Sequence, residues 1–180
     1  IKRSRETADN MSKGVRFLLK KNKIDVINGT GKISKNRTVV VEDAQGTAQP
    51  YQANHVIIAT GGRSRPLPQL PIDHKKVIDY RDAMILNEQP KSMIIVGAGA
   101  IGVEFAYFYN SIGTKVTLIE YMPHLLPLED KEVSKEVTKS FTNAGIHVQT
   151  NTELVRVDTQ GAQCQVQFKT KEGAIRNLTG

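Results

Sequence analysis

The sequence predicts an α/β protein with two parts, an antiparallel β-meander followed by a domain built on a parallel sheet. Three observations support this expectation. Short strand patterns separated by turn residues fill residues 24–53. An apolar strand, a helical pattern and a second apolar strand then follow one another over 92–120, an order typical of a βαβ unit. A further helix, a strand and a hairpin complete the pattern up to residue 170.

The N-terminal third begins with a helical pattern over residues 1–22, in which apolar side chains recur near helical spacing. Because the chain starts at Ile1 inside this pattern, we expect residues to precede it. The meander that follows has predicted strands at Ile24–Asn28, Arg37–Glu42 and Tyr51–Ala53, with turns at Gly29–Gly31 and Gln45–Gly46. A fully apolar strand, Val56–Gly61, ends this part of the chain.

Prolines place the expected domain boundary. Three of them fall within residues 63–71, where they oppose both helix and strand, and a polar, mixed stretch runs on to residue 90. We therefore expect one domain over residues 1–66, a linker over 67–90 with a short helix at 82–87, and a second domain over 91–180.

The second domain has clear helix signals. A first helix is predicted over Ala100–Ser111, with Gly113 as its stop. Asp130 is the expected N-cap of a second helix, which Gly145 ends. The side chains expected to pack inward are Ile101, Phe105 and Phe108 on the first helix, and Val133, Val137 and Phe141 on the second.

The remaining patterns of this domain are strands. A third parallel strand is expected at Ile146–Thr150, and Glu153–Thr159 pairs with Gln163–Thr170 as a hairpin, with no closing apolar strand after it. The single cysteine, Cys164, alternates with Val166 and Phe168 on one face, so we expect a buried, inert thiol.

The most informative motif is the G-x-G-x-x-G sequence formed by Gly97, Gly99 and Gly102, followed by Glu120 at the end of the next strand. The first glycine permits a tight turn, the second lets backbone approach a pyrophosphate, and the third lets helix and strand pack closely. A carboxylate at Glu120 can accept hydrogen bonds from ribose hydroxyls and would repel a 2′-phosphate. The motif therefore predicts a Rossmann-like domain that prefers NADH to NADPH. The alternative is a tight turn with no ligand.

Charge and composition exclude several classes of function. The formal net charge of +7 comes from the first 40 residues; this cluster lacks interleaved aromatic residues, so we interpret it as a solvated helix face and rank nucleic-acid binding last. The four histidines show no ligand spacing, so no metal site is expected. No apolar run approaches the length of a membrane span.

Several phrases of the sequence resemble the pyridine nucleotide-disulphide oxidoreductases, flavoproteins with two dinucleotide-binding domains. The phrases are Asn28–Ile33, Ile58–Pro66, Pro90–Ala106 and Leu126–Asp130. Within this family they are most similar to the members that oxidise dihydrolipoamide with NAD⁺ through FAD and a redox disulphide. The resemblance covers essentially the whole chain.

The resemblance implies roles for particular residues. Residues 1–66 would be part of an FAD-binding domain and 91–180 an incomplete NAD-binding domain. FAD would contact Gly31, Thr60, Gly61 and Gly62. NAD would contact Gly97, Ala98, Gly99, Ala100, Ile101, Gly102, Val103, Glu104, Glu120 and Leu154, with Glu120 on the adenosine ribose and Leu154 beside the adenine. Glu104 matches a family carboxylate near the nicotinamide and flavin, so the resemblance implies a catalytic role for it. Without the resemblance, we would interpret Glu104 as an ordinary acid on a helix surface.

The resemblance also implies partners and marks departures from the family. The expected partners are the lipoyl domain of a 2-oxo-acid dehydrogenase complex and a second copy in a homodimer, located in the cytoplasm or in the matrix of a mitochondrion. The redox cysteine pair and the His–Glu base of the family are not in this sequence. A glutathione or mercuric reductase, an NADH oxidase relative and a non-catalytic NAD-binding module remain alternatives.

Overall fold

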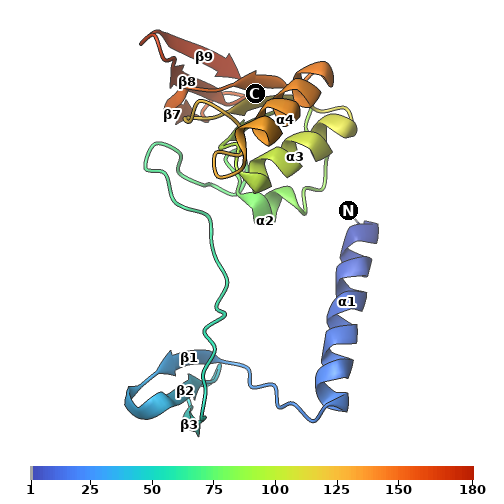
Figure 1. Cartoon of the computed structure of the whole chain (residues 1–180), viewed down its shortest axis with the longest axis vertical. Coiled ribbons are helices and arrows are strands. Elements are labelled where there is room, and N and C mark those ends of the chain that lie inside the picture. The colour runs from blue at the N-terminus through green and yellow to red at the C-terminus, as the bar shows by residue number, and fades with distance from the viewer. Residues whose placement is uncertain (1) are drawn as a thin grey trace. The chain divides into compact units, whose positions relative to one another are not determined.

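The structure is a computed structural model that describes residues 2–180. These residues form two compact units, one up to Arg63 and one from Ser64 onward, and each is described by itself (Figure 1). No helix within residues 2–180 is long and apolar enough to cross a membrane.

The first unit contains a long helix and a small antiparallel sheet. Its elements are α1 (Lys2–Lys21), β1 (Thr30–Ile33), the 3₁₀ turn η1 (Lys35–Arg37), β2 (Thr38–Glu42) and β3 (Ala48–Gln52). The strands lie in the order β1-β2-β3 and all pairs are antiparallel. The predicted N-terminal helix and the β-meander are therefore both present.

Two strands predicted for this unit are not formed. Ile24–Asn28 has no strand structure, and the expected turn at Gly29–Gly31 instead leads into β1, which contains Gly31. The apolar run Val56–Gly61 is also not a strand, and Ile57 is 89% exposed. A strand needs a neighbour for its backbone hydrogen bonds, and no strand within residues 2–180 pairs with either segment.

The second unit is organised around a parallel sheet with the order β4-β5-β6. Its strands are β4 (Ser92–Val96), β5 (Lys115–Ile119) and β6 (His147–Gln149), and its main helices are α3 (Ala100–Ser111) and α4 (Lys131–Asn143). Both helices lie on the same face of the sheet (Figure 1) and share one hydrophobic core with it. The predicted Rossmann-like βαβ arrangement is confirmed.

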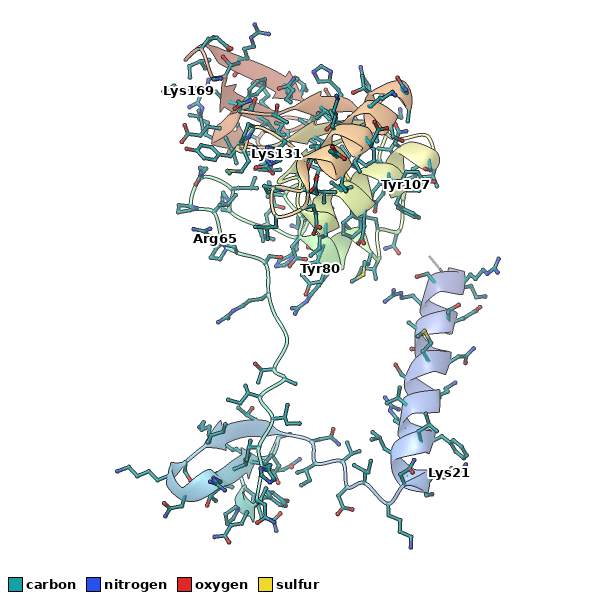
Figure 2. The ribbon with its side chains drawn as sticks, viewed as in Figure 1. Lys21, Arg65, Tyr80, Tyr107, Lys131 and Lys169 are labelled. Atoms are coloured by element: carbon teal, nitrogen blue, oxygen red, sulfur yellow. The ribbon has the colours of Figure 1, made fainter. Side chains whose placement is uncertain are left out.

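The helix ends agree with the sequence signals, but the buried faces differ from those expected. Ile101 and Phe108 of α3 are more than half exposed, whereas Ala106 and Tyr109 are buried. Tyr107 lies on the outer side of α3 (Figure 2). The buried face is the one that continues Gly102 at helical spacing, because that glycine lies against β4.

Helix α4 shows a smaller difference. Asp130 is its N-cap, and its carboxylate accepts a hydrogen bond from the Glu132 N–H at 2.8 Å, as expected. Phe141 is buried as expected, but Val133 is 48% exposed and Ser134 is buried in its place. The Ser134 hydroxyl donates within the helix to the carbonyl of Asp130, which satisfies the buried polar group.

A three-stranded antiparallel sheet packs against the other face of the parallel sheet. Its strands are β7 (Glu153–Asp158), β8 (Gln165–Lys169) and β9 (Ile175–Thr179). The hairpin β7–β8 was expected, whereas β9 was missed. Val166 and Phe168 are buried against Ile119 of β5. Cys164 was expected to be buried but is only half-buried, and this partial burial raises the pKa of its thiol.

Residues 67–90, expected from the sequence to be a linker, lie against this second unit. The Lys76 ammonium donates to the carbonyl of Thr159 at 2.7 Å, and the Tyr109 hydroxyl donates to the carbonyl of Ala83 at 2.5 Å. The Thr114 hydroxyl donates to the carbonyl of Pro90 at 2.8 Å. The short helix in this segment is α2 (Tyr80–Ala83), which begins earlier than the expected position, because Asp79 forms a capping box with Asp82.

An ion pair holds α2 to the loop before it and gives a testable pH dependence. The His74 ring nitrogen Nδ1 lies 2.9 Å from Asp82 Oδ2. The hydrogen bond that the His74 ring donates to the Asp82 carboxylate raises the pKa of His74 above its usual 6.5, and the same bond lowers the pKa of Asp82 below 3.8. The stabilisation from His74 is therefore present below pH 6.5 and lost as the pH rises through its raised pKa. That from Asp82 is present above pH 3.8 and lost as the pH falls through its lowered pKa.

We expect the His74 ring to titrate above pH 6.5 in a proton NMR titration of the folded chain, because its charged form is paired. Asp82→Asn removes the partner charge and should bring the midpoint back toward 6.5. The unaltered chain, titrated in the same way, is the control. An unchanged His74 midpoint in Asp82→Asn would show that the pair does not form in solution.

Candidate functional site

The candidate site is the turn that joins β4 to α3. Gly97 has a φ of +104°, a left-handed conformation that favours glycine, and its N–H donates to the carbonyl of Ile119 at 2.8 Å. Gly99 is the N-cap of α3, and no side chain caps this helix end. The first N–H groups of α3 therefore have no capping side chain within residues 2–180, and they lie at the carboxyl end of β4, where such groups can bind an anion.

The other two glycines of the motif differ in what surrounds them. A Cβ placed on Gly102 would lie 1.9 Å from the carbonyl oxygen of Gly97, so only glycine allows this approach of helix and turn. A Cβ placed on Gly99 would meet no atom within 4 Å. The open side of Gly99 is therefore space that a ligand, and not the protein, would fill.

Glu120 follows β5 and lies beside the turn. It is 8% exposed, and its Oε2 accepts a hydrogen bond from the Ala98 N–H at 2.6 Å while its Oε1 accepts one from the Met122 N–H at 2.7 Å. A carboxylate offers about four acceptor positions. Each oxygen therefore keeps a free position with which it can accept a hydrogen bond from a sugar hydroxyl.

A second contact on the turn was not expected from the sequence. The N–H of Leu126 donates to the carbonyl of Ala98 at 2.8 Å, so both backbone polar groups of Ala98 bond to the connection between β5 and α4. Leu126 has a φ of +49°. It precedes Pro127, which normally favours extended backbone, so the sequence carries no signal for this conformation.

The other residues predicted to bind NAD differ in how far they are exposed to solvent. Ala98 is fully buried, Val103 packs against the core, and Ala100, Ile101 and Glu104 are exposed. The Glu104 carboxylate has no hydrogen-bond partner within residues 2–180. Leu154 is 7% exposed and packs in the core with Ile119 and Phe168, so its side chain has little surface available for a ligand.

The residues predicted to bind FAD lie in the first unit. Gly31 is in β1, opposite Val41 of β2. Thr60, Gly61 and Gly62 are exposed and belong to no strand. This arrangement alone does not form a cradle for a flavin, whereas the turn at Gly97–Gly102 has the open glycine, the uncapped helix end and the acid that fit a dinucleotide.

Comparison with known proteins gives the family. The family described as "Pyridine nucleotide-disulphide oxidoreductase" matches residues 2–177. A dihydrolipoyl dehydrogenase from Zymomonas mobilis is 40% identical over 168 residues, which cover 92% of this chain and 36% of that protein. Another from Chlorobaculum parvum is 45% identical over 157 residues, or 87% of this chain and 34% of that protein. The chain thus spans about a third of the length of these curated relatives.

Two solved structures superpose on this chain. LpdA from Mycobacterium tuberculosis superposes with a TM-score of 0.83 at 26% identity, covering 96% of this chain and 38% of that one. The flavoprotein disulfide reductase RclA from Escherichia coli, solved as a Cu(II) complex, superposes with a TM-score of 0.72 at 28% identity, covering 94% of this chain and 40% of that one. Both likenesses extend over the two units of this chain.

Proposed function

This chain belongs to the pyridine nucleotide-disulphide oxidoreductase family, and from that premise we propose that it is the NAD-binding part of a flavoprotein that oxidises dihydrolipoamide to lipoamide. NAD⁺ would be the electron acceptor and FAD the second cofactor. The names of the relatives support the substrate, since the curated relatives reported above are dihydrolipoyl dehydrogenases. The observation that carries the cofactor proposal is the turn geometry, with Gly99 open to solvent and Glu120 beside it.

The proposed roles follow from the positions of the groups. The N–H groups at the start of α3 would bind the diphosphate, which the positive end of the helix dipole favours. Glu120 would accept hydrogen bonds from the adenosine ribose. Exposed Glu104, further along α3, is proposed for the nicotinamide side. Leu154 is proposed for the adenine side through its backbone, because its side chain is buried in the core. Gly31 and Thr60–Gly62 are proposed as backbone contacts to FAD.

The chemistry itself would come from the cofactors and from groups outside these residues. A flavin passes electron pairs between a disulphide and a nicotinamide, and the protein binds and orients both. Cys164 is the only cysteine here, so the redox disulphide would lie outside the 180 residues, and the resemblance to the family implies the same for the His–Glu base. The part of the reaction proposed for this chain is to hold the nicotinamide cofactor in place.

The choice of nicotinamide cofactor can be measured directly. We expect the chain to bind NADH at least about tenfold more tightly than NADPH, because a 2′-phosphate would lie close to the Glu120 carboxylate, where two negative charges repel strongly. Titration calorimetry with each cofactor measures the two Kd values. Equal affinities, or tighter binding of NADPH, would contradict the assignment and favour a glutathione or mercuric reductase.

The substrate is tested with the complete protein. Turnover of dihydrolipoamide with NAD⁺ would support the proposal, whereas reduction of glutathione disulphide with NADPH would identify another branch of the family. NADH binding without any turnover would favour a non-catalytic NAD-binding module. The lipoyl domain, the homodimer and the cytoplasmic or mitochondrial location belong to the same proposal and follow from the relatives alone.

A further inference from the structure

We propose that Glu120 is a positioning residue for the glycine turn, in addition to any contact it makes with a ribose. Its carboxylate would hold the Ala98 peptide so that the N–H groups of the turn point at a diphosphate. This inference rests on the NAD site proposed above. It differs from the ribose contact because it predicts an effect on ligands that have no ribose hydroxyls.

The geometry around Ala98 carries the inference. The Glu120 carboxylate accepts the Ala98 N–H at 2.6 Å, and the Leu126 N–H donates to the Ala98 carbonyl at 2.8 Å. Ala98 itself is fully buried. The peptide groups at the centre of the turn are therefore fixed from both sides by the segment that follows β5.

The backbone of Glu120 is itself held by hydrogen bonds to two other segments. Its N–H donates to the carbonyl of Gln149 at 2.8 Å, and its carbonyl accepts from the Thr152 N–H at 2.9 Å. Its second carboxylate oxygen accepts from Met122. A side chain anchored in this way can fix its partner, because hydrogen bonds to a charged group are stronger than those between neutral groups.

Substitution by glutamine would break this arrangement. Both neighbours of the carboxylate, Ala98 and Met122, are N–H donors. A glutamine offers one acceptor oxygen and one NH₂ group, so one of the two donors would face another donor. The turn would then lose a contact even though the side chain keeps its size.

The experiment compares ADP with 2′,3′-dideoxy-ADP, which keeps the diphosphate and adenine but has no ribose hydroxyls. Both ligands are titrated against the unaltered chain, Glu120→Gln and Glu120→Asp by calorimetry. Glu129→Gln is the matched control, because it removes the same charge from the same connection at an exposed site. Amide hydrogen exchange at Ala98 is measured on every variant without ligand.

We expect Glu120→Gln to bind dideoxy-ADP roughly five- to tenfold more weakly and to exchange the Ala98 N–H roughly tenfold faster, the size expected for the net loss of one hydrogen bond. Glu120→Asp keeps the charge but is one methylene shorter, so it should show losses of the same direction. A residue that acts only on ribose predicts no loss of dideoxy-ADP affinity. Removal of its charge would leave dideoxy-ADP binding unchanged or make it tighter, as in Glu129→Gln.

Unchanged or tighter dideoxy-ADP binding by Glu120→Gln, together with unchanged Ala98 exchange, would overturn the inference. If Glu120→Gln does not fold, the dideoxy-ADP affinity and the Ala98 exchange rate of Glu120→Asp test the inference in its place. If the unaltered chain binds neither ADP nor its dideoxy form, the proposed cofactor site is wrong. Ala98 exchange would still show whether Glu120 holds the turn.

Discussion

Gly102→Ala is expected to destabilise the second unit by about 3 kcal/mol, the upper range for forcing one extra carbon into a packed site. The new Cβ would lie 1.9 Å from the Gly97 carbonyl oxygen and 3.0 Å from its carbonyl carbon. Both are backbone atoms, so no side-chain rotation can relieve the contact. Either α3 moves away from β4 or the turn changes its conformation, and the NADH affinity falls in both cases.

Thermal unfolding followed by circular dichroism measures this loss. For a chain of this length the expected decrease in Tm is roughly 6–12 °C. Gly14→Ala is the control, because a Cβ at Gly14 in α1 meets no atom within 4 Å and alanine favours a helix interior by about 1 kcal/mol. An unchanged Tm in Gly102→Ala would mean that α3 and the turn do not pack as described.

Gly99→Ala is expected to have the opposite profile, with a stable fold and weak cofactor binding. Gly99 has φ −70° and ψ −178°, which alanine adopts without strain. A Cβ there meets no protein atom, and the loss of a glycine N-cap costs less than about 1 kcal/mol. The methyl group would instead occupy the space through which a diphosphate approaches the backbone, so we expect the NADH affinity to fall at least about tenfold.

Calorimetric titration with NADH, together with a Tm measurement, separates the two effects. Gly99→Ala should lose affinity while its Tm stays within a few degrees of the unaltered chain. Gly102→Ala should lose both. An NADH affinity that Gly99→Ala leaves unchanged would place the diphosphate away from this turn and contradict the proposed site.

Local sequence signals predicted the helix ends well. The bounds of α3, the cap at Asp130 and the stops at Gly113 and Gly145 all depend on residues within one or two turns of each other. The parallel sheet and the β7–β8 hairpin were also predictable. Their apolar runs and turn residues are likewise local patterns.

The prediction of which face of α3 is buried was partly wrong, and the reason is the position of a glycine. Of the predicted inward residues, Phe105 packs against the core as expected. Ile101 and Phe108 are exposed, because the sheet lies against the face that carries Gly102 and Ala106. A glycine needed for close approach marks the buried face more reliably than the largest side chains. Ala106 and Tyr109, which follow Gly102 by four and seven positions, lie on the same face of the helix as this glycine and are buried.

The strands at Ile24–Asn28 and Val56–Gly61 failed for a different reason. Each has the composition of a strand, but a strand forms only beside a partner, and the composition of a segment does not show where its partner lies. The third strand of the C-terminal sheet, β9, was missed because its residues alternate only weakly between apolar and polar. It forms because β8 is available beside it.

The glycine turn, the helix that follows it and the acid at the end of β5 could all be located from the sequence, because glycine spacing and hydrophobic period are local properties of the chain. The use of that acid depends on a contact between segments that are far apart in the chain. Glu120 and Ala98 are 22 positions apart, and their hydrogen bond exists because β4 and β5 lie side by side in the sheet. Such a contact depends on how the chain closes on itself, which no local pattern records.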